Sequence, residues 1–254
     1  MLKHIMASWD KLAQDDALTA ILTTDGGVAQ RWNEAEFFAT GVTAVDAVLA
    51  RLELMGESPG MGRALDFGCG VGRLTHALSQ RFEAVDGVDV SRVMIEKAAA
   101  LRKTPAHVRF LHNPRGDMSL LSGTRYSFVL SLICLQHMPE RVALGYIRGM
   151  CDLLAPAGVA YLQISTHLNP AQPDTRAKLA RDASRLNRIY RRLRGLLFPV
   201  RTLSSQTHYC RLSEITRVLE EKRMRIVSVL PDASLPKRFV SHVVVFKNPA
   251  VVGH

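Results

Sequence analysis

A short apolar run passes into a helical pattern through three closely spaced glycines in RALDFGCGVGRLT, residues 63–75. Glycines at 68, 70 and 72 have no Cβ, so a ligand can lie directly against the backbone of this turn. The following helix would offer unpaired N–H groups at its N-terminus. A second apolar run ends in Asp89, nineteen positions after Gly70, where a carboxylate can accept both hydroxyls of a ribose. The pattern predicts a nucleoside cofactor at this turn.

The glycine spacing also excludes two common classes of nucleotide site. It reads G-x-G-x-G rather than the G-x-G-x-x-G of dinucleotide enzymes, and no Lys-Ser or Lys-Thr pair follows it, as a P-loop requires.

From about residue 63 onward, short β-branched runs alternate with helical patterns, which predicts a parallel sheet with helices on both faces. We expect strands over 63–67, 84–88, 108–112, 127–132 and 159–164. Two further strands, 225–229 and 240–246, are separated by a loop from Pro231 to Pro236 that has no helical pattern. Parallel crossovers normally need a helix, so these two should form an antiparallel hairpin at a sheet edge. Residues 1–60 are predicted to be mainly helical, with a second helix over 44–54.

Composition narrows the class of protein. The 254 residues are 47% hydrophobic, which excludes disordered and fibrous chains. No apolar run approaches the length of a membrane span, and the N-terminus lacks the apolar core of a signal peptide. The four cysteines have no metal-binding or disulfide spacing, so a cytoplasmic protein in a reducing compartment is expected.

Most of the net charge lies in one segment. The formal charge is +10, and residues 166–211 hold ten Arg and Lys against two Asp, which gives +8. Within 176–194 the arginines recur at helical spacing on one face. Three interpretations stay open: a lid that attracts an anionic acceptor, a helix in peripheral contact with an anionic membrane surface, or a solvated face.

Four ordered motifs carry a family resemblance: ALDFGCGVGRLT, GVDVSRVMIEKA, FVLSLICLQHMP and LLAPAGVAYLQI. Together they resemble the class I S-adenosylmethionine-dependent methyltransferases over roughly residues 60–165, with the late strand pair extending the resemblance to about 247. The resemblance implies an α/β, Rossmann-like, doubly wound sheet of seven mostly parallel strands with an antiparallel last strand. It also implies an N-terminal helical cap over 1–60, a cofactor-binding domain over 61–254, and a basic helical lid inserted at 166–211.

The resemblance also assigns site residues. The methionyl part of S-adenosylmethionine would be held by Asp66 and by the backbone of the turn, and Asp89 would hold the ribose. The residues expected at the cofactor are Asp66, Gly68, Cys69, Gly70, Gly72, Asp89, Val90, Met94, Asn113 and Asp117. Of the last two, either could contact the adenine amine, and Asp117 is slightly favoured. Two positions depart from the family pattern: Ser127 stands where Asp is common, and Ala157 where Gly is common.

Methyl transfer from a sulfonium needs positioning and desolvation more than a catalytic group. His137, after the fourth strand, is the candidate base for a hydroxyl or amine acceptor; a purely structural role in its loop is the alternative. His112 and His208 are weaker candidates. Ile133 and Gln136 occupy the places where some quinone-precursor O-methyltransferases carry metal-binding carboxylates, so no metal is expected.

The expected function is O- or N-methylation of a small-molecule or carrier- or glycan-linked acceptor. An RNA methyltransferase and a non-catalytic cofactor-binding scaffold are the alternatives, and nucleic acid is disfavoured because stacking aromatics are few, at 6%. The aromatic residues of the N-terminal region would either wall the methyl site or pack the cap onto the sheet. They are Trp9, Trp32, Phe37 and Phe38.

Overall fold

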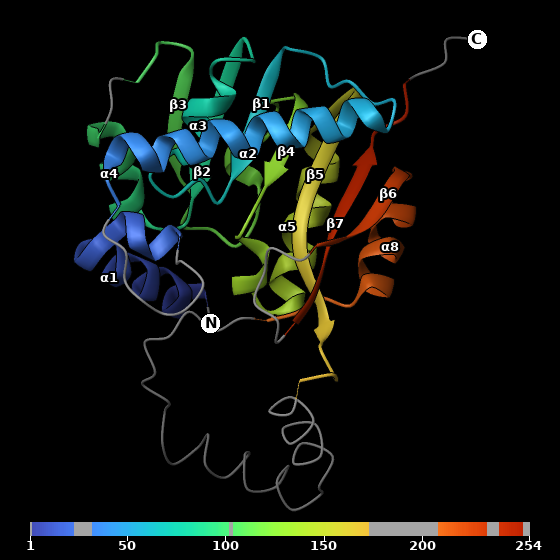
Figure 1. Cartoon of the computed structure of the whole chain (residues 1–254). Helices are drawn as coiled ribbons and strands as arrows, with labels where there is room; N and C mark the ends of the chain where they lie inside the picture. Colours follow the sequence, from blue (N-terminus) through green and yellow to red (C-terminus); the bar gives the residue numbers. More distant parts are fainter. Residues whose placement is uncertain (1, 23–31, 102–103, 173–207, 233–238, 251–254) are drawn as a thin grey trace, which may run out of the picture.

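A computed structural model describes residues 2–22, 32–101, 104–172, 208–232 and 239–250. One seven-stranded sheet forms its centre, with strand order β3-β2-β1-β4-β5-β7-β6 (Figure 1). The first five strands pair in parallel, whereas β7 runs antiparallel to both β5 and β6. The predicted fold class is therefore confirmed, including the antiparallel pair at one edge.

The strands agree with the expected runs apart from their ends. They are β1 (Arg63–Phe67), β2 (Ala84–Asp89), β3 (Val108–His112), β4 (Tyr126–Ser131), β5 (Leu154–Leu168), β6 (Arg225–Asp232) and β7 (Phe239–Lys247). The largest difference is β5, which is longer than predicted at both ends, because Leu154 pairs with Tyr126 of β4 at its start and β7 pairs with it as far as Leu168 at its end. Pro231 lies within β6 rather than in the loop, as an edge strand allows.

Helices cover both faces of the sheet. On one face, α2 (Glu34–Leu54) crosses the strands beside α3 (Arg73–Leu78), and both contribute buried apolar side chains to a shared core (Figure 1). On the other face lie α5 (Glu140–Leu153) and α8 (Leu212–Glu221). Helix α2 begins ten residues earlier than predicted, because Asn33 caps it by accepting the Ala35 N–H at 2.8 Å.

Of the two N-terminal helices, only α1 (Leu2–Ile21) lies near the carboxyl ends of the strands, where it packs on α4 (Arg92–Leu101). The division into a cap over 1–60 and a domain over 61–254 stays a prediction. Most of the predicted lid falls within residues 173–207, which lie outside the described residues. Within the described part of the chain, no helix combines the length and the apolar composition needed to cross a membrane.

A buried charge cluster ties the first four strands together. Asp86 of β2 has no exposed surface, and its carboxylate accepts bonds from Arg109 at 2.7 and 2.8 Å, from Arg63 at 3.2 Å and from the Tyr126 hydroxyl at 2.7 Å. Burial acts to raise the pKa of Asp86, but these hydrogen bonds and the two arginine charges outweigh it, and the pKa lies below its usual range.

Asp86→Asn should lower the free energy of unfolding by about 2–3 kcal/mol at pH 7, because two guanidinium groups lose their anion. A depressed pKa stabilises the fold above the unfolded value of about 4 and loses that effect as the pH falls through the folded pKa. Urea unfolding should therefore show a smaller difference from the wild type at pH 3 than at pH 7.

Asp46→Asn is the matched control, since Asp46 pairs with Arg81 on the surface, where both side chains are 46% exposed. It should change stability by less than about 0.5 kcal/mol. An Asp86→Asn effect as small as this, or equal at both pH values, would contradict the account.

Candidate functional site

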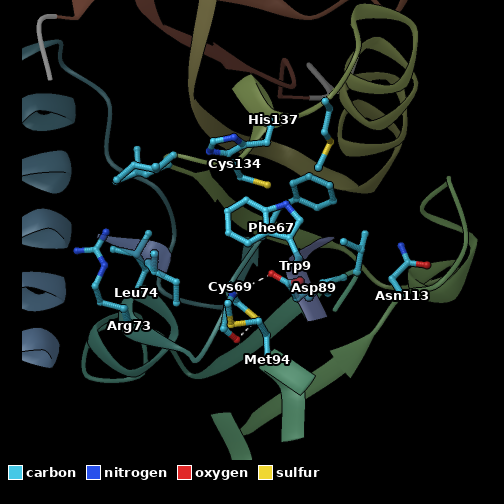
Figure 2. Close-up of a pocket in the computed structure, with 18 of the residues that line it drawn as sticks. Trp9, Phe67, Cys69, Arg73, Leu74, Asp89, Met94, Asn113, Cys134 and His137 are labelled. Atoms are coloured by element: carbon cyan, nitrogen blue, oxygen red, sulfur yellow. Dashed lines mark hydrogen bonds between the residues drawn. The ribbon is translucent and has the colours of Figure 1, made fainter. Parts of the chain in front are cut away.

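A cavity opens at the carboxyl ends of β1, β2 and β4, with about 830 Å³ of space, part of it open to solvent. Its walls come from the turn after β1, the end of β2, the turn after β4 and the inner face of α1. Figure 2 shows His137 and Cys134 at one end, Cys69 and Met94 at the other, and Trp9 with Asp89 between them. The lining residues include Phe67, Gly68, Cys69, Gly70, Arg73, Asp89, Val90, Met94, Asn113, Ile133, Cys134 and His137, together with Ile5, Trp9 and Ile21 of α1.

The turn after β1 is left-handed at all three glycines, with φ of 80° at Gly68, 53° at Gly70 and 87° at Gly72. L side chains rarely adopt this conformation. Space excludes a side chain as well: a Cβ at Gly68 would collide with the side chain of Cys134, and one at Gly70 would lie 2.6 Å from Ile21 Cδ1. Neighbouring elements therefore approach the turn closely, as the glycine pattern predicts.

Asp89, at the end of β2, is bound into this turn. Its Oδ2 accepts the Gly70 N–H at 2.9 Å, and its Oδ1 accepts the Ser91 N–H at 2.8 Å. Burial raises the pKa of Asp89, although these backbone bonds oppose the rise. The carboxylate lines the cavity and is only partly covered, so it can accept further hydroxyl donors there.

Asp66 lies behind the cavity wall, next in the chain to Phe67, which lines it. Its carboxylate is fully buried; Thr75 donates a 2.6 Å bond to Oδ2, whereas Oδ1 has no hydrogen-bond partner. Burial raises the pKa of Asp66 to about 6, against the opposing effects of the Thr75 bond and the Arg73 charge. Such an unpartnered buried oxygen suits a cationic or donor group at the site.

The two candidates for the adenine contact differ in position. Asn113 lines the cavity; its side-chain amide donates to the Asp117 carbonyl at 2.8 Å and accepts the Arg115 N–H at 3.2 Å. Asp117 is exposed and is not among the lining residues. Its carboxylate accepts the N–H and hydroxyl of Ser119, which hold its pKa below the usual range. Val90 and Met94 also line the cavity.

His137 lies in a short 3-10 turn after β4, with its ring 5.1 Å edge-to-face from Trp9. Burial, together with the neighbouring His208, lowers the pKa of His137 to about 4, and its Nδ1 has no hydrogen-bond partner. The imidazole is therefore neutral at pH 7.

The aromatic residues of the N-terminal region have different roles. Trp9 lines the cavity, whereas Phe37 and Phe38 pack α2 against α1. Trp32 donates its indole N–H to the Leu22 carbonyl at 2.9 Å.

Three features of the site have no simple sequence signal. Asp10 of α1 accepts the Ser91 hydroxyl at 2.6 Å, which anchors α1 beside Asp89. Arg73, almost fully buried, lines the cavity and donates to the Thr40 hydroxyl at 3.3 Å. Ile133 has a left-handed φ of 55°, and its N–H donates to the side-chain oxygen of Gln163 in β5 at 2.7 Å. Each depends on contacts between distant segments.

No group of three or more His, Cys, Asp or Glu side chains in the described ranges is arranged to hold a metal ion. Cys134 contacts the turn at Gly68, and burial raises the pKa of its thiol, so it is not a thiolate at neutral pH.

Comparison with known proteins agrees with this geometry. Residues 64–158 match a family model described as "Methyltransferase domain". A ubiquinone biosynthesis O-methyltransferase of Xanthomonas campestris pv. campestris (strain B100) is 29% identical over 142 residues, which cover 53% of this chain and 56% of that protein. One from Psychrobacter arcticus is 28% identical over 135 residues, covering 52% and 49%. The chain thus matches about half the length of these relatives.

Two solved structures share the fold over nearly the whole chain. The magnesium protoporphyrin IX methyltransferase of Synechocystis PCC 6803, with bound S-adenosylhomocysteine, has a TM-score of 0.60 at 19% identity and covers 96% of this chain and 98% of its own. The N-methyltransferase NodS of Bradyrhizobium japonicum WM9, in complex with the same molecule, has a TM-score of 0.57 at 15% identity and covers 95% and 99%. Residues 64–158 thus match a methyltransferase domain, and the chain has the fold of the class I S-adenosylmethionine-dependent methyltransferases that its sequence resembles.

Proposed function

We propose that this protein binds S-adenosylmethionine in the cavity and transfers its methyl group to the oxygen of a small-molecule acceptor. The observation that carries the proposal is the Asp89 carboxylate, which lines a cavity bounded by a left-handed glycine turn within the matched methyltransferase domain. The named O-methyltransferase relatives favour oxygen over nitrogen. None of the comparisons given above names a nucleic-acid acceptor.

The residues present fit this cofactor. Asp89 lines the cavity and can accept two ribose hydroxyls, and the glycine turn lets a ligand lie against its backbone. Asp66, which the family resemblance assigns to the methionyl part, is buried behind Phe67 and does not line the cavity, so this contact stays a prediction. Val90 and Met94 offer apolar contacts to the adenine. Because Asn113 lines the cavity and Asp117 is exposed, we assign the adenine edge to Asn113 rather than to Asp117.

When bound, S-adenosylmethionine supplies an electrophilic methyl group for in-line displacement. The chain's own contribution is to exclude water and to orient the acceptor. Trp9, Ile133 and Met138 give the methyl end an apolar lining. His137 is neutral, and its free Nδ1 can accept the acceptor's hydroxyl proton as the new C–O bond forms.

An anionic acceptor, recruitment to an anionic membrane surface and a cytoplasmic location remain predictions from the sequence. The first two rest on the arginines of 176–194, which lie outside the described residues. The +8 charge of 166–211 supports them, because a concentrated positive field attracts anions over about one Debye length, roughly 8 Å at physiological salt.

Calorimetry should show S-adenosylhomocysteine binding with micromolar affinity, about −8 kcal/mol. Asp89→Asn should weaken it about 10- to 100-fold, because charge-assisted bonds to the ribose contribute about 1.5–3 kcal/mol. Asp117→Asn is the matched control and should keep the affinity within about twofold, since Asp117 does not line the cavity. Binding of NAD but not of S-adenosylhomocysteine would overturn the proposal.

Methyl transfer can be measured with isotope-labelled S-adenosylmethionine and a panel of phenols and hydroxylated aromatic acids. His137→Ala should lower turnover about 100-fold, the low end for a general base, because a base with a pKa of about 4 takes up a proton weakly. The rate should fall as the pH drops through about 4, where the imidazole becomes protonated. His107→Ala, at an exposed histidine outside the cavity, should not change the rate. Equal rates for both variants would return His137 to a structural role.

A further inference from the structure

The turn after β4 has a backbone conformation that its own sequence disfavours. Ile133 is β-branched, yet its φ of 55° lies in the left-handed region, where such side chains are rare. Cys134 follows it and fills the space against Gly68, and His137 follows three residues later. The position of this turn therefore sets both the wall opposite the glycine turn and the place of the candidate base.

A side chain from the next strand holds the turn in this conformation. Gln163 of β5 is 6% exposed, and its Oε1 accepts the Ile133 N–H at 2.7 Å. The left-handed conformation of Ile133 turns its N–H away from ordinary strand pairing. The bond to Gln163 gives this N–H its acceptor. An apolar residue at 163 would leave that N–H without its partner.

A third strand sets the orientation of the Gln163 amide. Its Nε2 donates to Asp232 Oδ2 of β6 at 2.7 Å. Because a carboxylate accepts hydrogen bonds and cannot donate them, the NH₂ end must face Asp232 and the oxygen must face Ile133. The two bonds thus connect β6 to a β5 side chain and that side chain to the turn after β4. They do so although β7 lies between β5 and β6 in the sheet.

We propose that Gln163 and Asp232 are positioning residues for methyl transfer: through the Ile133 N–H they fix the turn that places Cys134 and His137 against the cavity. The inference rests on the proposed function for its catalytic meaning. Its structural content, that this pair fixes the surroundings of His137, can be tested without a methyl acceptor.

Trp9 supplies the readout. The chain has two tryptophans, so Trp32→Phe leaves Trp9 as the only indole, 5.1 Å from the His137 ring. Protonated imidazole quenches indole fluorescence, so Trp9 emission against pH follows His137 protonation. His137→Ala in the same background gives the contribution of other titrating groups near the site, including His208 and Asp89. All of the following variants are made in the Trp32→Phe protein.

The protein with Gln163 and Asp232 intact should show only about a tenth of the full His137-dependent quenching at pH 5, as a pKa of about 4 requires. Gln163→Met removes the bonds to Ile133 and Asp232 at similar volume. The released turn should expose His137 to water, and the midpoint should rise to about pH 6, towards the ordinary histidine value. Asp232→Leu should shift the midpoint in the same direction, whereas Asp232→Asn, which can still accept the amide bond, should keep it near 4.

Ser241→Ala is the matched structural control. It removes the buried 3.1 Å bond between Ser165 and Ser241, which also joins β5 to a neighbouring strand but does not reach the turn. It should leave the midpoint unchanged. Thermal melting confirms folding of each variant, and S-adenosylhomocysteine affinity, expected to stay within about threefold throughout, tests the proposed function separately.

The proposal is overturned if folded Gln163→Met and Asp232→Leu keep the midpoint near pH 4, or if Ser241→Ala shifts it as much as they do. Should Gln163→Met fail to fold, the Asp232→Leu and Asp232→Asn comparison decides, and equal midpoints overturn the proposal. If the Trp32→Phe protein does not bind S-adenosylhomocysteine, the proposed function is contradicted. The fluorescence titration still tests whether Gln163 and Asp232 fix the turn after β4.

Discussion

The Asp89 carboxylate and its near neighbour Ser91 connect three segments that are far apart in the sequence: the turn after β1, the end of β2 and α1. Asp89 ends β2, accepts the Gly70 N–H of the turn after β1, and accepts the Ser91 N–H before α4. Ser91 in turn donates its hydroxyl to Asp10, so α1 is anchored at the same point. The Asp89–Gly70 bond reinforces the backbone link between the glycine turn and β2, in which the Gly68 and Cys69 N–H groups donate to the Val88 carbonyl at 2.8 and 3.1 Å. The Asp10–Ser91 bond acts together with the apolar contacts between α1 and α4 to hold α1 over the cavity.

Burial in and behind the cavity wall disfavours the charged forms of two ionisable side chains, Asp66 and His137. Burial raises the pKa of Asp66 to about 6 and lowers that of His137 to about 4, so both groups are shifted towards their neutral forms. A cationic ligand would favour the charged form of Asp66, whereas His137 stays an uncharged acceptor. His137 therefore offers the cavity an uncharged hydrogen-bond acceptor, whereas the charge of Asp66, behind the wall, depends on the groups next to it.

Much of the fold could be predicted because its signals are local. The glycine turn, the acid at the end of the second strand and the late antiparallel pair all follow from short patterns, and the structure has each of them. The start of α2 differs from the predicted residue 44 although its local signal is clear, since Asn33 caps the helix and Glu34 and Glu36 lie in its first turn. The choice between Asn113 and Asp117 needed the path of the loop after β3, which places one in the cavity and the other in solvent. The Gln163 bond to Ile133 joins positions thirty residues apart, which no periodicity records.

A crystal structure with S-adenosylhomocysteine tests the central claim most directly. The account predicts both ribose hydroxyls within about 3 Å of the Asp89 carboxylate, a normal hydrogen-bond distance, with the amino end against the turn at Gly68–Gly72 and the sulfur facing His137. A ligand bound elsewhere, or one whose ribose lies away from Asp89, would contradict it.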